Sequence, residues 1–388
     1  MFMKPRSRLC QPFGGARGLG GAGGAGGAGG AGGAGGAGGA GGAGGAGGDN
    51  MLDASGVLLS RDALAGAFDG PSVRDDLQLK PLDDNQPLRG WEAWVRGTVM
   101  DVELLQGISF NVLNKAGAAV RPGTAGARRA RGYGLSWVGG AGPVDIARLY
   151  RPTHITRQAM QAQVEHVIRY ADLREDRLGE VMSQIPQLGS YWTTIAGLHP
   201  SRTRWTLELL GAASRLAIAV EMRFKHAFAF PRPVQFSPQV QPLIQTPSHS
   251  AFPSGHATEA HCAACVLTAV AGQNGSTPLG RMLLRQAGRI AINRTVAGVH
   301  FPIDSRSGQV LGTCLAEFLI SRCAPANRRR AFQARSFDAD GYLGWDFLAP
   351  AIDKTDAGPG LTLVGRPVRA ARSPPLGWLW DQARAEWP

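Results

Sequence analysis

Apolar residues recur at three- and four-residue spacing along much of the second half of the chain, which is the period of an amphipathic α-helix. Met160, Val164 and Val167 begin this pattern, and Leu209 and Leu216 continue it in a longer segment. The predicted helices cover residues 156–171, 174–185, 201 to just before Pro231, 254–270, 276–296 and 305–320. Five or more helices joined by short loops predict an all-α fold, a helical bundle.

Residues that start or stop helices mark the ends of these segments. Ser201 and Ser254 suit the N-cap position, and Asp304 is expected to cap the helix that follows it. Gly298 interrupts the preceding helix, because glycine adopts the left-handed conformation easily and favours a helix end. The polar residues that could take part in binding or catalysis lie near these predicted ends.

The chain divides into four predicted segments. Residues 1–50 form a Gly-Ala-rich tail whose Gly-Gly-Ala repeat buries too little apolar surface to fold, so disorder is expected, and Met51 is a candidate translation start. Residues 51–152 are predicted to be irregular, with a few short helices or strands. Residues 153–335 hold the helical domain. Residues 336–388 are predicted to pack irregularly over the bundle as a C-terminal extension.

Charge and cysteine content narrow the function classes. The 388 residues carry a formal net charge of +12, which indicates an anionic partner. No groove-reading motif accompanies the basic clusters, so nucleic-acid binding is not expected. The five cysteines do not suggest a disulfide framework, and Cys262 and Cys265 lie in an apolar run typical of a buried helix.

The hydropathy of the chain bears on its location. No run of about 18 apolar residues is present, so no transmembrane segment is predicted. No apolar segment follows the basic N-terminal residues, unlike in a secretory signal. We therefore predict a soluble, cytoplasmic protein, and a homodimer is compatible with the sequence.

Three groups of polar residues between positions 225 and 304 suit the binding of a tetrahedral oxyanion. Lys225 and Arg232 are about two helical turns apart and can converge, and Arg294 adds a third cation. Ser254 and Gly255 lie at a predicted helix N-terminus, where unpaired N–H groups and the helix dipole favour an anion. The sequence therefore predicts an oxyanion pocket at helix ends.

Two histidines add chemistry to this predicted pocket. His256 lies in the first turn of its helix and can serve as a general acid, because its ordinary pKa is near neutrality. His300 precedes Asp304 by four residues, so the carboxylate can bind one ring nitrogen and raise the basicity of the other. That second nitrogen can attack phosphorus or ligate a metal.

The spacing of these residues resembles that of one superfamily, the type 2 phosphatidic acid phosphatases and vanadium haloperoxidases. Its three motifs are K-x6-R-P, P-S-G-H and S-R-x5-H-x3-D. The matching residues, with every spacing kept, are Lys225, Arg232 and Pro233, then Pro253, Ser254, Gly255 and His256, then Arg294, His300 and Asp304. Asn293 departs from the pattern by standing where the third motif has serine.

The resemblance implies a role for each matching residue. Lys225, Arg232 and Arg294 would neutralise the oxyanion, and Ser254 and Gly255 would bind its oxygens. In a phosphatase, His300 would be the nucleophile, Asp304 would orient it, and His256 would protonate the leaving group. In a haloperoxidase, His300 would ligate vanadate, and His256 would be the acid–base group while peroxide oxidises halide. The phosphatase would need no cofactor.

The sequence leaves two branches open. His249 lies where algal bromoperoxidases have histidine, on the halide or substrate side of the pocket, and the long helical region before the motifs is similar to the haloperoxidases. The short link between His256 and Arg294 is more like the phosphatases. We therefore predict a soluble vanadium-dependent haloperoxidase that uses peroxide and halide. The alternative is an acid-phosphatase-like enzyme that hydrolyses phosphate esters through a phosphohistidine.

Overall fold

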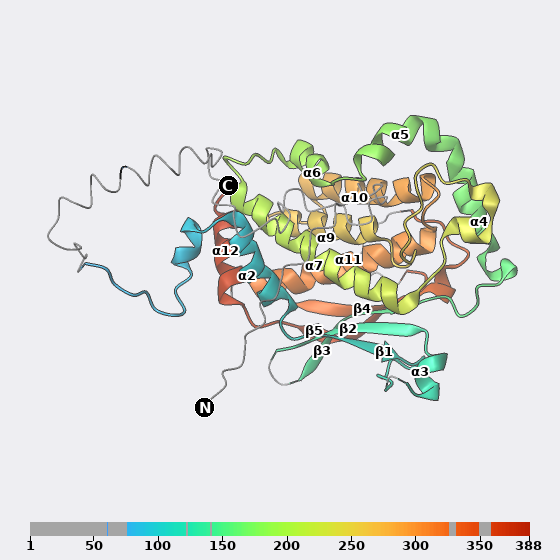
Figure 1. Ribbon diagram of the computed structural model, residues 1–388, viewed down its shortest axis with the longest axis horizontal. Helices are drawn as coiled ribbons and strands as arrows, with labels where there is room; N and C mark the ends of the chain where they lie inside the picture. Colours follow the sequence, from blue (N-terminus) through green and yellow to red (C-terminus); the bar gives the residue numbers. More distant parts are fainter. Residues whose placement is uncertain (1–59, 61–75, 122, 140–141, 326–330, 349–357) are drawn as a thin grey trace, which may run out of the picture.

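The computed structural model describes residue 60 and residues 76–121, 123–139, 142–325, 331–348 and 358–388 (Figure 1). The predicted Gly-Ala-rich tail and the candidate start at Met51 lie outside these residues. The helices are α2 (Ala93–Leu105), α3 (Ala125–Arg129), α4 (Arg157–Arg169), α5 (Arg174–Ser183), α6 (Gly189–Ala196), α7 (Arg204–Phe228), α8 (Pro233–Phe236), α9 (Gly255–Val270), α10 (Pro278–Val296), α11 (Pro302–Cys323) and α12 (Pro374–Arg384). Short 3-10 helices are η1 (Gln86–Gly90), η2 (Tyr170–Leu173), η3 (Pro238–Val240) and η4 (Ala339–Tyr342).

The helical part of the molecule is organised around α9. This helix packs against α7, α10 and α11, and nearly all of its side chains are buried. Its sequence is rich in Ala, Cys and Val on every side, as expected of a helix surrounded by other helices rather than one with a solvent face. Figure 1 shows α9 lying between α10 and α7, with α11 nearer the sheet.

Two glycines of α11 allow it to approach α9 closely. A Cβ atom at Gly312 would collide with the Thr258 carbonyl oxygen, and one at Gly308 would lie 2.5 Å from the Ser254 carbonyl oxygen. Side chains larger than hydrogen are therefore excluded from this contact. The same close approach places the first turn of α11 directly beside the N-terminus of α9.

Replacing Gly312 by alanine is expected to lower the free energy of unfolding by about 1–3 kcal/mol, because the added methyl group overpacks the α9–α11 contact. Gly179→Ala in α5 is the matched control, since a Cβ there meets no atom within 4 Å. That control should be neutral or stabilise the protein by up to about 1 kcal/mol. Equal effects of the two substitutions in urea denaturation would contradict the close approach.

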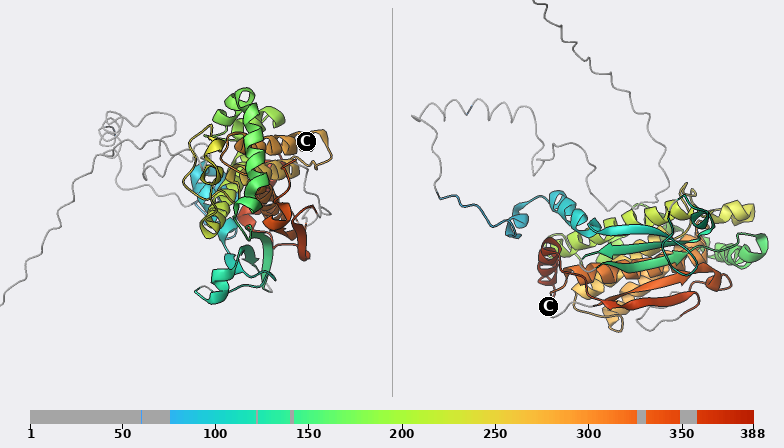
Figure 2. Two further views of the ribbon diagram at one scale, coloured as in Figure 1. Left: turned by 90° about the vertical axis from the view of Figure 1, so that its right-hand side faces the viewer. Right: turned by 90° about the horizontal axis from the view of Figure 1, so that it is seen from below.

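A five-stranded mixed sheet covers one side of the bundle, so the predicted all-α fold is wrong. The strands are β1 (Ile108–Leu113), β2 (Gly132–Val138), β3 (Pro143–Tyr150), β4 (Phe332–Asp338) and β5 (Leu361–Val368), in that spatial order. β3 and β4 are parallel, and the other neighbours are antiparallel. Figure 2 shows the sheet from its outer face with the helices behind it.

The sheet arises from the two segments that were predicted to be irregular. β1–β3 come from residues 51–152, and β4 and β5 come from the end of the chain. In β2 the large apolar residues Tyr133, Leu135 and Trp137 alternate with glycine and serine, a period of two typical of a strand, although the small residues between them are also buried. The predicted division between residues 335 and 336 falls inside β4.

Side chains from α11 attach the sheet to the bundle. Arg335 of β4 is 1% exposed and donates two hydrogen bonds to Glu317 of α11, at 2.8 and 2.9 Å. Phe318 of α11 packs its ring against Trp137 of β2 and Phe332 of β4. The sheet therefore shares one hydrophobic core with the helices.

The C-terminal residues form a regular helix rather than the predicted irregular cover. Ser373 accepts a hydrogen bond from the Leu376 backbone N–H, and prolines occupy the first turn of α12. Trp378 and Trp380 are buried, and the Trp378 ring meets Trp205 of α7 edge to face at 5.2 Å. Among the helices of the described residues, none has the length and apolar character that crossing a bilayer requires.

Candidate active site

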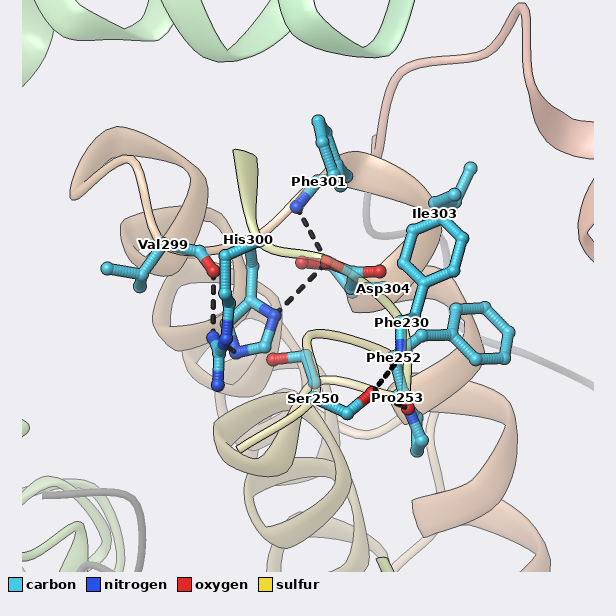
Figure 3. Close-up of polar contacts among 12 residues, drawn as sticks. Phe230, Ser250, Phe252, Pro253, Val299, His300, Phe301, Ile303 and Asp304 are labelled. Atoms are coloured by element: carbon cyan, nitrogen blue, oxygen red, sulfur yellow. Dashed lines mark hydrogen bonds and ion pairs between the residues drawn. The ribbon is translucent and has the colours of Figure 1, made fainter. Parts of the chain in front are cut away.

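The three predicted groups of polar residues meet at one end of the bundle. The C-terminal ends of α7 and α10 and the N-terminal ends of α9 and α11 lie there, with the 229–254 loop between them. Ser254 caps α9 through its side chain, and its backbone N–H donates to the Asp304 carbonyl oxygen at 2.9 Å. Figure 3 shows His300 and Asp304 beside the loop residues Ser250, Phe252 and Pro253.

Lys225 and Arg232 are held by backbone carbonyl groups, which for Arg232 are those of His249 and Val299. Lys225 is 1% exposed, and its ammonium donates to the carbonyl oxygens of Ser250 and Pro253 at 3.1 and 2.5 Å. Burial lowers the pKa of Lys225 to about 8 and that of Arg232 to about 10. Two cations fixed by neutral carbonyl groups keep most of their positive charge available for an anion.

His300 has a defined tautomer in this structure. Its Nδ1 lies 3.2 Å from Asp304 Oδ2, and its Nε2 lies 3.1 Å from Arg232 Nη1. Arginine can only donate, so Nε2 carries the lone pair and Nδ1 carries the proton. Burial together with Arg232 and Lys225 lowers the pKa of His300 well below its ordinary value, so the neutral ring is favoured.

Asp304 does not cap α11 as predicted, because that helix already begins at Pro302. The Asp304 carboxylate instead lies in the first turn and accepts from the Phe301 backbone N–H at 2.8 Å (Figure 3). Burial raises its pKa to about 7, while this backbone hydrogen bond acts in the opposite direction. The result is a carboxyl group whose Oδ2 orients His300.

The His256 side chain points towards the C-terminal end of α5, where it is hydrogen-bonded. Its Nε2 donates to the backbone carbonyl oxygen of Gln184 at 2.9 Å. Burial, aided by the charge of Arg294, lowers the pKa of His256 to about 3, so the ring is neutral at pH 7. An anion beside it would offset the charge of Arg294 and raise that pKa.

Arg294 and Asn293 are also tied to α5 and to Gln184, the residue that follows it. Arg294 Nη2 donates to the Val181 carbonyl oxygen at 3.0 Å and to Gln184 Oε1 at 2.8 Å. The Asn293 side chain, at the motif position where serine was expected, donates to Glu180 at 2.8 Å. The asparagine therefore serves as an anchor between α10 and α5.

His249 lies beside Arg232 in the same cluster. Its Nδ1 is 3.1 Å from Arg232 Nη2, and burial lowers its pKa to about 4. Its Nδ1 also lies 3.3 Å from the Ser250 carbonyl oxygen, which can only accept, so these two neighbours favour opposite tautomers. Its Nε2 has no hydrogen-bond partner among the described residues. His249 thus places a buried ring nitrogen without a partner beside Arg232, and the charge of Lys225 also acts on this ring.

Sequence reasoning missed Glu221, which lies one helical turn before Lys225. Glu221 is 1% exposed, and its carboxylate occupies the space that a Cβ atom on Gly255 would need. Burial raises its pKa to about 7, while Lys225 and Arg232 act to lower it. Glu259 of α9 is a buried neighbour that accepts from the Ser214 hydroxyl at 3.2 Å. The four-residue spacing from Lys225 was the available signal.

Glu221 should leave a signature in the pH dependence of stability. Its raised pKa means that the folded protein keeps a proton between pH about 4.5 and about 7 that the unfolded chain releases, so its contribution to stability falls as pH rises through this window. The unfolding free energy of Glu221→Gln relative to wild type should therefore increase across it, by up to about 3 kcal/mol. A pH-independent difference in urea denaturation would contradict this assignment.

Several buried polar atoms around the cluster lack a partner within the described part of the chain. They are Arg294 Nε, Gln184 Nε2, His249 Nε2, Asp304 Oδ1 and Glu221 Oε2. The first two are donors, and unpaired buried donors cost free energy unless a ligand accepts from them. Together with Lys225, Arg232 and the N-terminus of α9, this donor set fits a tetrahedral oxyanion, and we treat it as the candidate active site.

Comparison with known proteins places this site in a family. The model of the PAP2 superfamily matches residues 206–329, which include every motif residue described above. The chain is 31% identical over 122 residues to the decaprenylphosphoryl-5-phosphoribose phosphatase of Mycobacterium tuberculosis, covering 31% of this chain and 63% of that protein. It is 30% identical over 131 residues to the protein of the same name from Mycolicibacterium smegmatis, covering 33% and 67%. The chain belongs to the PAP2 superfamily, which confirms the resemblance seen in its motifs.

Two solved structures are also similar in part. One is a bacterial vanadium-dependent iodoperoxidase, with 19% identity, a TM-score of 0.34, and coverage of 42% of this chain and 49% of that one. The other is a transmembrane PAP2 type phosphatidylglycerolphosphate phosphatase from Bacillus subtilis, with 26% identity, a TM-score of 0.32, and coverage of 42% and 84%.

Proposed function

We propose that this protein is a phosphatase that hydrolyses phosphate monoesters through a phosphohistidine on His300. This proposal reverses the preference for a haloperoxidase drawn from the sequence. The observation that carries it is the tautomer of His300: Asp304 holds Nδ1–H, and the Nε2 lone pair faces the buried cations. The same tautomer would suit a vanadate ligand, so the preference over the haloperoxidase rests on the curated relatives, which are phosphatases.

In the first step, His300 Nε2 attacks the phosphorus of the ester. The bond from Nε2 to phosphorus forms, and the bond from phosphorus to the ester oxygen breaks. Arg232 now donates to Nε2, so its hydrogen bond must pass to a phosphoryl oxygen as the substrate binds. Lys225, Arg294 and the backbone N–H groups at the start of α9 stabilise the charge on the other oxygens.

His256 supplies the proton that the leaving oxygen needs. In the substrate-free site its pKa of about 3 leaves it neutral, because it is buried beside Arg294. A phosphate dianion compensates that positive charge, so His256 becomes a better base and takes up a proton with the substrate. It then returns the proton to the alcohol that leaves.

In the second step, water attacks the phosphohistidine. His256 accepts a proton from the water, the new oxygen–phosphorus bond forms, and the nitrogen–phosphorus bond breaks. Inorganic phosphate leaves, and His300 returns to its starting tautomer because Asp304 still holds Nδ1–H. The site therefore needs no metal for this route.

The names of the relatives bear on which class of alcohol is esterified to the phosphate. The relatives are named for a phosphate ester of a ribose that is linked to a decaprenyl phosphate. We infer that this protein also acts on a phosphorylated sugar or on a related monoester. The matched region spans 63% of the length of the Mycobacterium tuberculosis relative.

Trapping of the intermediate tests the proposal. Purified protein is mixed with a radiolabelled phosphate monoester and quenched in alkali, which preserves phosphohistidine and hydrolyses phosphoserine more readily. Label on the peptide that contains His300, with release of phosphate in steady state, is expected. Turnover of para-nitrophenyl phosphate without any acid-labile label would exclude the covalent route.

A vanadium haloperoxidase is the second candidate, and His249 is the observation that favours it. Its Nε2 is buried without a partner among the described residues, and the ring lies beside Arg232, so in the tautomer that carries the proton on Nε2 it can donate to a halide or to a peroxide oxygen. The residues fit vanadate as they fit phosphate, with His300 Nε2 as the ligand, and bound vanadate would supply activation of peroxide. Orthovanadate should inhibit a phosphatase but should confer bromide oxidation on a haloperoxidase, so one titration separates the two.

A further inference from the structure

Gln184 lies outside the three motifs and outside the residues matched by the family model, yet it contacts two of the motif residues. It follows the last residue of α5, and its side chain is fully buried. Its backbone carbonyl oxygen accepts from His256 Nε2, and its side-chain Oε1 accepts from Arg294 Nη2 at 2.8 Å. Figure 1 shows α5 and α10 near one another on the side of the bundle away from the sheet.

The neighbours of Gln184 determine which way its amide points. Arg177 can only donate, and its Nη1 lies 2.9 Å from Asn293 Oδ1. Asn293 Nδ2 must therefore be the donor to Glu180 Oε2 and, at 3.3 Å, to Gln184 Oε1. Two donors, from Asn293 and Arg294, thus converge on Oε1 of Gln184. The opposite assignment would set donor against donor at both contacts.

This polarity leaves the Gln184 amide nitrogen as an unused donor. Nε2 is buried and has no acceptor among the described residues. It belongs to the same planar amide as Oε1, so it lies within one amide width of the Arg294 guanidinium, whose Nε is also buried without a partner there. Both unpaired donors lie next to a buried cation, and one negatively charged acceptor would satisfy them.

We propose that Gln184 is a further ligand of the oxyanion and donates an Nε2–H hydrogen bond to one of its oxygens beside Arg294. This inference rests on the proposed function, because it requires an oxyanion in the pocket. Asn293 and Glu180 act as positioning residues that hold the amide in the donating orientation. The oxyanion site therefore extends beyond the superfamily motifs and includes the end of α5.

Affinity for inorganic phosphate, measured by calorimetry and as competitive inhibition of ester hydrolysis, tests this inference. Gln184→Met removes the donor and keeps the length of the side chain, so affinity should fall roughly ten- to a hundredfold. Gln163→Met is the matched control, because Gln163 is equally buried but its amide is fully used by Leu343, Trp345 and Ile303. The control should lose stability, and its phosphate affinity should change far less.

Two further measurements test the donated hydrogen bond. Gln184→Glu keeps the acceptor for Arg294 and Asn293 but lacks the N–H and adds a negative charge, so affinity should fall at least as far as in Gln184→Met, and wild-type affinity would overturn the inference. In the wild type, the side-chain amide resonance of Gln184, identified by its loss in Gln184→Met, should shift as phosphate saturates the protein. An unchanged resonance, as expected for an amide that binds only internal water, would also overturn it.

Failure of the proposed function and failure of the Gln184 assignment give different results in these experiments. If neither phosphate nor orthovanadate binds wild-type protein, the oxyanion pocket itself is wrong. If both bind and Arg294→Ala abolishes binding while Gln184→Met and Gln184→Glu bind normally, only the assignment of Gln184 fails. A thermal unfolding curve for each variant shows whether it is folded, and the resonance measurement needs only wild type and one variant.

Discussion

Replacing His300 by alanine is expected to lower kcat for phosphate monoester hydrolysis by at least about a thousandfold, because the nucleophile is lost. The folded state should persist, since the side-chain hydrogen bonds that His300 makes to Asp304 and Arg232 lie within the pocket. The measurement is steady-state hydrolysis of para-nitrophenyl phosphate together with the yield of acid-labile label.

The control for this experiment is His226→Ala. His226 lies on α7 next to Lys225 but is exposed, so it points away from the pocket, and its loss should leave kcat nearly unchanged. Binding of inorganic phosphate to His300→Ala should survive, because Lys225, Arg232 and Arg294 remain. Normal turnover by His300→Ala would remove the phosphohistidine mechanism, whereas loss of phosphate binding would indicate a wider structural change.

Replacing Glu317 by alanine is expected to lower the free energy of unfolding by about 3–5 kcal/mol. Arg335 is 1% exposed and both of its Glu317 contacts are close, so the substitution leaves a buried guanidinium without its carboxylate. Urea denaturation followed by circular dichroism measures the change. The sheet and α11 should be affected together, because the pair joins them.

An exposed ion pair provides the comparison for Glu317. Glu165 lies 3.9 Å from Arg169 on α4, and the side chains are 47% and 74% exposed. Glu165→Ala should therefore cost less than about 0.5 kcal/mol, because water and salt screen the pair. Similar costs for the two substitutions would show that Arg335 finds other partners or reaches solvent.

The helical core could be predicted from sequence because its signals are local. The predicted segments 174–185, 254–270 and 276–296 agree closely with α5, α9 and α10, since apolar periodicity, serine and proline starts, and Gly298 mark their ends. The sheet could not be predicted in the same way. β3 and β4 pair across nearly half of the chain, and no local pattern in Ala147 or Arg335 indicates that partner.

In the candidate site, too, residues within sequence motifs could be predicted, whereas residues whose role depends on helix packing could not. The motif residues share known spacings, so their meeting at helix ends was predictable from Lys225, Ser254 and His300. Gln184 and the anchoring role of Asn293 were not, because their contacts depend on how α5 packs against α10. A glutamine after a short helix has no sequence signal that separates a ligand from a surface residue.

The parallel pairing of β3 with β4 has a consequence for how the molecule assembles. All of the helices from α4 to α11 lie between these two adjacent strands in the chain, so the bundle is an insertion within the sheet. During synthesis β3 emerges early and must wait for β4, which follows α11. A fragment limited to residues 206–329 would lack both strands and expose the α11 side chains that pack on them, so the segment that defines the family is not expected to fold alone.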